Sequence, residues 1–150
     1  MSGPDPSSSR AIDRVQPQRD RLREAQGTFE SACGGPSAAL QVARAALVEL
    51  RDAFTAHVEY AEGPAGLFEE MQLEVPVESA AEMDRLRRDH ITIFGIIDRL
   101  DGLLTADGVE VDDPRVGEAI GELVRLINDH RRRGAELLYD VYDVDVGGSG

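Results

Sequence analysis

The sequence predicts an all-α protein, an antiparallel up-down-up-down bundle of four helices. Apolar residues recur at alternating spacings of three and four along four segments, which is typical of helices with one buried face. Stretches that contain glycine and proline separate these segments. No strand pattern of alternating apolar and polar residues competes with this assignment. Short connections between helices favour antiparallel neighbours.

The first two helices are expected over residues 12–32 and 38–62. A Gly-Gly-Pro sequence ends the first helix, and Ser37 can cap the second. The inward positions are Val15, Leu22, Ala25 and Phe29 in the first helix, and Leu40, Ala43, Leu47, Leu50, Phe54, His57 and Ala61 in the second. A Gly-Pro pair then interrupts the second helix, and the LFEEMQL sequence is expected to add a helical turn or two.

The last two helices are expected over residues 78–105 and 114–142. The sequence TADGVEVDDP connects them, with Asp113 as the N-cap and Pro114 at the first helical position. The inward positions are Ser79, Met83, Leu86, His90, Ile93, Ile97, Leu100 and Leu104 in the third helix, and Val116, Ile120, Leu123, Ile127, His130, Gly134, Leu137 and Val141 in the fourth.

The composition limits the domain count and the classes of partner. The 150 residues suffice for one domain with a hydrophobic core, which we assign to residues 11–143, with flexible tails over 1–10 and 144–150. The net charge of −13 would repel phosphates, which argues against nucleic acids and anionic membranes as partners. Without a long apolar run or a signal sequence, the chain is expected to be soluble and cytoplasmic. The single cysteine, Cys33, excludes an internal disulfide and a multi-cysteine zinc site.

The chain has three histidines, and each lies on the inward face of a different helix. His90 lies about fifteen residues before the last connection and His130 about sixteen residues after it, so at about 1.5 Å per residue both rings reach the same level. Similar counting places His57 within about two turns of that level. One buried imidazole can be satisfied by a hydrogen bond, whereas three that converge predict a shared metal ion or a polar cluster.

The sequences HVEYAEGPAGLF, LRRDHITIF and LINDHRRRGAELLY resemble the second, third and fourth helix signatures of hemerythrin-like (HHE cation-binding) domains. The resemblance covers most of residues 12–142 in helix order and spacing. It implies a four-helix bundle with a di-iron centre. In that centre the second helix supplies a histidine and a bridging glutamate four residues later, and the third supplies two histidines four residues apart. The fourth helix supplies a histidine with an acid five residues on, and the first helix supplies one more histidine.

Most of the ligands that the resemblance implies are absent here. The positions that should carry further ligands are occupied by Ala61, Phe94 and Ala135, and Arg19 or Gln26 occupies the corresponding face of the first helix. Gly134 and its neighbours look like a ligand-bearing turn that has lost its second ligand. Because neither bridging position carries an acid, we expect no complete di-iron centre.

The residues that remain predict a site for one metal ion. Three neutral imidazoles, from His57, His90 and His130, with a carboxylate or water, would suit Zn²⁺ or Fe²⁺. Glu62 is the expected fourth ligand, and Glu136 is the second choice. Whether either acid faces the core is not determined by the pattern.

The arginines are expected to play ordinary surface roles. Arg19 is interpreted as a surface residue of the first helix. The run of three arginines at 131–133 could form an anion site, but ion pairs with the chain's own 29 acidic residues are the simpler interpretation.

Three functions are compatible with the sequence. The first is a hemerythrin-like binding protein with one iron or zinc ion, for the sensing or binding of iron, oxygen or nitric oxide. The second is a metal-free bundle that acts as a protein-interaction or structural domain, and a protein partner or a homodimer is compatible with it. The third is a small non-haem metalloenzyme that acts on peroxide, which requires an open coordination position. Because no nucleophile–base pair, phosphate-binding loop or dinucleotide fingerprint is present, a non-enzymatic function is favoured.

Overall fold

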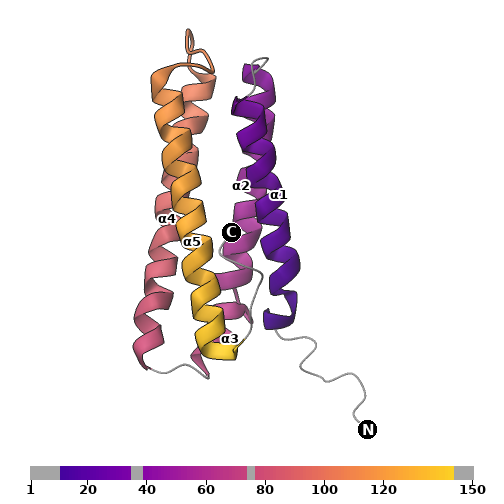
Figure 1. Ribbon diagram of the computed structural model, residues 1–150, viewed down its shortest axis with the longest axis vertical. Helices are drawn as coiled ribbons and strands as arrows, with labels where there is room; N and C mark the ends of the chain where they lie inside the picture. Colours follow the sequence, from indigo (N-terminus) through magenta and orange to yellow (C-terminus); the bar gives the residue numbers. More distant parts are fainter. Residues whose placement is uncertain (1–10, 35–38, 74–76, 144–150) are drawn as a thin grey trace.

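A computed structural model describes residues 11–34, 39–73 and 77–143, and the two expected tails and the Ser37 cap lie outside these residues. The described part is all-helical and has no strand, as predicted. The elements are η2 (Ala11–Arg14), α1 (Val15–Gly34), α2 (Leu40–Glu62), α3 (Leu67–Gln72), α4 (Val77–Thr105) and α5 (Pro114–Tyr142). Figure 1 shows the four long helices side by side, with α3 near one end. The predicted helix bounds agree closely with the observed ones.

The ends of α5 follow directly from the local sequence. The Asp113 side chain accepts a hydrogen bond from the backbone N–H of Arg115 at 2.8 Å, and Pro114 is the first helical residue, which confirms the predicted start. Asp143 follows the last helical residue and caps the helix: it has a left-handed backbone (φ 57°) and donates its N–H to the carbonyl of Tyr139.

A tight turn after α2 directs the chain into α3. The N–H of Gly63 donates to the carbonyl of Glu59 at 2.9 Å and closes the helix. A Cβ atom at Gly66 would lie 2.6 Å from the carbonyl oxygen of Tyr60, so only glycine fits at this position. The turn therefore depends on glycine and brings the short helix α3 back against the end of the bundle.

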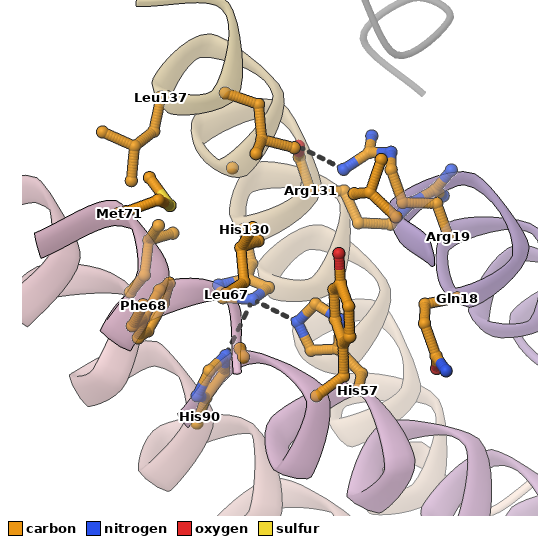
Figure 2. A pocket seen from close by; sticks show the side chains of 16 residues that line it. Gln18, Arg19, His57, Leu67, Phe68, Met71, His90, His130, Arg131 and Leu137 are labelled. Carbon is orange, nitrogen blue, oxygen red and sulfur yellow. Dashed lines mark hydrogen bonds between the residues drawn. The ribbon is translucent and has the colours of Figure 1, made fainter. Parts of the chain in front are cut away.

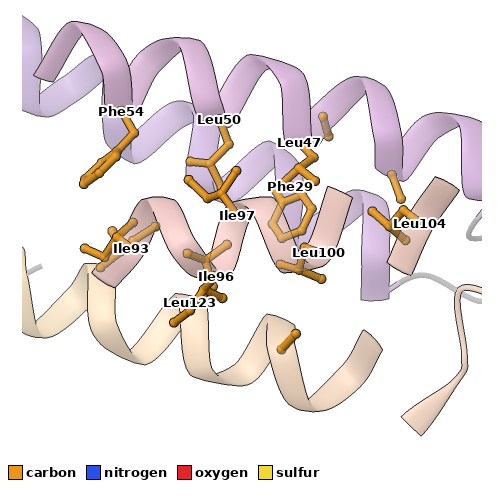
Figure 3. Packing of buried hydrophobic residues seen from close by; sticks show 14 of the residues in the cluster. Phe29, Leu47, Leu50, Phe54, Ile93, Ile96, Ile97, Leu100, Leu104 and Leu123 are labelled. Atoms are coloured by element: carbon orange, nitrogen blue, oxygen red, sulfur yellow. The ribbon is translucent and has the colours of Figure 1, made fainter. Parts of the chain in front are cut away.

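Two apolar clusters fill the interior. The larger includes Leu22, Phe29, Leu47, Leu50, Phe54, Ile93, Ile97, Leu100, Leu104 and Leu123, which come from all four long helices (Figure 3). The smaller surrounds α3 and includes Val15, Leu67, Phe68, Met71, Met83, Leu86, Leu137 and Leu138. Helix α1 packs mainly on α2, and α5 packs mainly on α4; the two pairs meet through α2 and α4. No helix in the described residues is long and apolar enough to cross a membrane.

Two isoleucines of α4 provide a matched test of the assigned core. Ile97 is fully buried, whereas Ile91 is 75% exposed on the same helix. We expect Ile97→Ala to lower the free energy of unfolding by about 2–5 kcal/mol, because the substitution leaves a cavity. Ile91→Ala should change it by less than about 0.5 kcal/mol. Urea denaturation measures both, and equal losses would contradict the assigned packing.

Candidate metal centre

Three histidine side chains meet inside the bundle, one each from α2, α4 and α5 (Figure 2). The Nε2 atom of His130 lies 3.0 Å from Nε2 of His57 and 3.2 Å from Nε2 of His90. The ring centroids are 4.7–5.3 Å apart. The prediction that the three rings converge is therefore confirmed, and the three residues are close enough to hold a single metal ion.

Two carboxylates orient the rings from outside. Nδ1 of His90 contacts the Glu62 carboxylate, and Nδ1 of His130 lies 3.0 Å from Oδ2 of Asp89. Arg133 donates to the same Asp89 oxygen at 2.7 Å and holds it in place. Imidazole–carboxylate pairs of this kind orient metal-binding histidines and raise the basicity of the nitrogen that faces the metal.

These contacts also determine which ring nitrogens carry protons. A carboxylate only accepts hydrogen bonds, so Glu62 and Asp89 each require an N–H at the Nδ1 atom that they contact. A neutral imidazole has one N–H, so Nε2 of His90 and Nε2 of His130 are both bare acceptors. When both rings are neutral, these two atoms, 3.2 Å apart, have facing lone pairs that repel each other unless a proton or a metal ion lies between them.

Desolvation favours the uncharged forms of His57 and His90. Desolvation, followed by the neighbouring histidines and then Arg19 and Arg131, holds the pKa of His57 well below its ordinary value. Desolvation and His130 lower the pKa of His90 to about 4, although the Glu62 carboxylate opposes this shift. An additional proton on His57 or His90 is therefore disfavoured at neutral pH.

Asp89 remains ionised beside the rings. Burial raises the pKa of its carboxyl group, but hydrogen bonds from His130 and Arg133 outweigh this effect and hold the pKa below its usual value. The negative charge therefore stays next to the Nδ1–H of His130.

The site lies between the two apolar clusters. Phe54 contacts all three histidine rings at centroid distances of 5.6–6.2 Å. Phe68, from α3, stacks on His90 at 6.2 Å. The two phenylalanine rings limit the movement of the imidazoles. Because Phe68 belongs to α3, the turn that positions α3 also forms one wall of the site.

A small cavity opens beside the histidines. Its lining combines the three rings with Arg19 and Arg131 and with apolar residues that include Leu67, Phe68, Met71, Leu137 and Leu138 (Figure 2). The space that admits water-sized groups amounts to about 40 Å³. This is room for a ligand of a few atoms.

Other predicted ligand positions are placed as follows. Glu62, expected as the fourth ligand, contacts Nδ1 of His90, on the ring edge away from the converging Nε2 atoms. Glu136 is exposed and does not line the cavity. Ala61 is buried in the cavity wall, and Phe94 packs edge-on against Phe54 at 5.0 Å.

The surface assignment of Arg19 is wrong. Its side chain is only 6% exposed, because it lies four residues after Val15 and three before Leu22 on the same buried face of α1. Its Nη1 atom donates to the carbonyl oxygen of Arg131 at 3.4 Å. A Cβ atom at Gly134 would lie 4.0 Å from the same Nη1 atom, which is an ordinary van der Waals distance, so position 134 faces this guanidinium.

The expected pairing of the arginine run is correct for two of its three members. Arg132 pairs with Asp129 at 3.1 Å, and Arg133 pairs with Asp89. Arg131 is instead 5% exposed and donates at 3.4 Å to the side-chain oxygen of Gln26, not to an acid. It points inward because it directly follows His130 and reaches the side of α5 that faces α1.

Sequence reasoning missed Asp89. Its position immediately before His90 rotates it toward α5, where it meets His130 at the level already deduced for the two histidines. The Asp-His sequence at 89–90 was therefore a usable signal, whereas the same pair at 129–130 was not, because Asp129 pairs with Arg132.

Comparisons of the chain with protein-family models, with curated proteins and with solved structures find no match.

The lowered pKa values predict how the stability of the metal-free protein depends on pH. Between about pH 6.5 and pH 4 the unfolded chain binds protons that the desolvated rings of His57 and His90 do not, so acidification favours unfolding. Urea denaturation of chelator-treated protein should therefore show a falling free energy of unfolding from pH 7 to pH 5. His90→Gln should reduce this slope. A free energy that stays constant over the range would contradict the neutral, buried histidines.

Proposed function

We propose that this chain is a binding protein for one metal ion, held by the Nε2 atoms of His57, His90 and His130 in a hemerythrin-like bundle. The observation that carries the proposal is the convergence of three Nε2 atoms while carboxylates contact the opposite ring nitrogens of His90 and His130. A divalent cation relieves the repulsion between the facing lone pairs, and the two carboxylates offset its charge.

The proposal includes the antiparallel up-down-up-down order of such a bundle. The connection over residues 106–113 can span at most about 29 Å, whereas a 29-residue helix is about 43 Å long. Helix α5 can therefore pack along α4 only if it runs back in the opposite direction. The resemblance of the helix sequences to hemerythrin-like domains supports the same order.

The distances among the histidines suit one ion. Tetrahedral coordination at about 2.0–2.1 Å separates ligand nitrogens by about 3.3 Å. The two Nε2–Nε2 distances that include His130, 3.0 and 3.2 Å, need to expand only slightly to reach this value, and the ligand atoms of all three histidines lie within 4.8 Å of one another. Three neutral imidazoles accept Zn²⁺ or Fe²⁺, and we propose one of these two ions.

We further propose that the metal binds a small ligand, such as oxygen or nitric oxide if the metal is iron. Three protein ligands leave a coordination position open. Of the acids expected to fill it, Glu62 contacts Nδ1 of His90 and Glu136 is exposed. The adjoining cavity admits only a few atoms, which supports a sensing or binding role for a small molecule.

Elemental analysis of the purified protein tests the metal. We expect one iron or zinc ion per chain in the wild type and loss of that ion in His130→Ala, because His130 Nε2 is central among the three nitrogens. Asp89→Asn should weaken binding about 10–100-fold, since it disturbs the orientation of His130.

A surface acid provides the matched control. Glu122 forms an exposed ion pair with Arg99, so Glu122→Gln should leave the metal content unchanged. Wild-type protein without metal, whose thermal stability does not rise when Fe²⁺ or Zn²⁺ is added, would refute the proposal and favour a metal-free interaction domain. Two irons per chain would refute the single-ion site.

A further inference from the structure

We propose that Arg19 and Arg131 form an anion-binding site in the cavity beside the histidines, and that its ligand is a short-chain monocarboxylate. The inference goes beyond the proposed metal site and does not depend on it, because the two guanidinium groups belong to other parts of the cavity wall. Figure 2 shows them together on the side of the cavity opposite Phe68, Met71 and Leu137.

Both arginines are buried and incompletely paired. Arg19 is 6% and Arg131 is 5% exposed. The Nε and Nη2 atoms of each have no hydrogen-bond partner among the described residues. The Nη1 atoms donate to the Arg131 carbonyl oxygen and to Gln26, and both distances are long at 3.4 Å. Four guanidinium nitrogen atoms of residues that line the cavity therefore lack a hydrogen-bond acceptor among the described residues.

The charges around the pair leave an excess of positive charge. No acid pairs with Arg19 or Arg131 in the described part of the chain, although the sequence contains 29 acidic residues. Desolvation, and then the charge of Arg131, lower the pKa of Arg19 to about 10, a value at which it still carries its charge at neutral pH. Asp20 raises the pKa of Arg19, but its effect is smaller than those of Arg131 and Arg23. Two buried like charges therefore remain poorly compensated, and a bound anion stabilises both.

The unpartnered atoms indicate the shape of the ligand. Nε and Nη2 lie on one edge of a guanidinium group, and this edge matches the two oxygens of a carboxylate. These nitrogens have almost no exposed surface, so the flexible ends of the side chains must turn slightly toward a ligand in the cavity that they line. Two such edges can grip one carboxylate group.

The remaining walls indicate the rest of the ligand. Met71, Leu137 and Leu138 make the wall away from the two guanidinium groups apolar, and the space admits only a few atoms. A short alkyl chain can occupy it, whereas a phosphate with two charges would lose more hydration than the apolar wall can replace. A monocarboxylate such as propionate or butyrate has a carboxylate group for the two arginines and a short alkyl chain for the apolar wall.

Butyrate binding to chelator-treated protein tests the proposal without the metal. We expect sodium butyrate, compared with sodium chloride at equal ionic strength, to raise the thermal midpoint of the wild type, because it binds the folded state. In Arg19→Met and Arg131→Met, whose folding is checked by circular dichroism, the dissociation constant should rise at least tenfold. Each variant should also have a higher midpoint than the wild type without butyrate, because a buried unpaired charge is removed.

The exposed Arg115, which pairs with Asp113, provides the control, and Arg115→Met should bind butyrate like the wild type. Equal midpoints in butyrate and chloride would overturn the proposal, as would butyrate binding that persists in both methionine variants. Stabilisation by inorganic phosphate and not by butyrate would overturn the assignment of the ligand. Because no metal is present in the assay, failure here leaves the histidine site to be judged by its own test.

Discussion

The hydrogen bonds from two imidazole Nδ1 atoms to carboxylates are the constraint on which the centre of this protein depends. Glu62 and Asp89 place protons on the outer nitrogens of His90 and His130, so the Nε2 atoms of the neutral rings face each other as acceptors. An arrangement of this kind is repulsive by itself and becomes favourable around a cation. The fold therefore holds three histidines at distances compatible with the metal ion that we propose.

The surrounding helices and the turn after α2 hold these carboxylates and imidazoles in position. Asp89 links α4 to α5 through His130, and Glu62 is the last residue of α2, where the turn that requires Gly66 begins. That turn also brings α3 into position, so that Phe68 stacks on His90, while Phe54 contacts all three imidazole rings. The same small cavity then brings an arginine pair and a histidine cluster together in a chain whose overall charge is strongly negative.

Apolar periodicity and helix caps were sufficient to predict the four long helices, because spacings of three and four residues define a buried face directly. Level counting from Asp113 predicted the meeting of His90 and His130 for the same geometric reason. The roles of polar residues beside those faces were not predictable in this way. Arg19 was misassigned because charge usually indicates a surface position, and Asp89 was missed because its partner lies on another helix. Such contacts depend on how helices rotate against each other, which spacing within one helix does not specify.

The central claim concerns proton positions, and ¹⁵N NMR of the histidine rings in chelator-treated protein at neutral pH measures them directly. The account predicts the Nδ1–H tautomer for both His90 and His130, and it predicts that one equivalent of Zn²⁺ shifts the Nε2 resonances of all three histidines while the Nδ1 protons remain. A proton on Nε2 of His90 or His130 in the metal-free protein, or Nε2 resonances that do not respond to Zn²⁺, would contradict it.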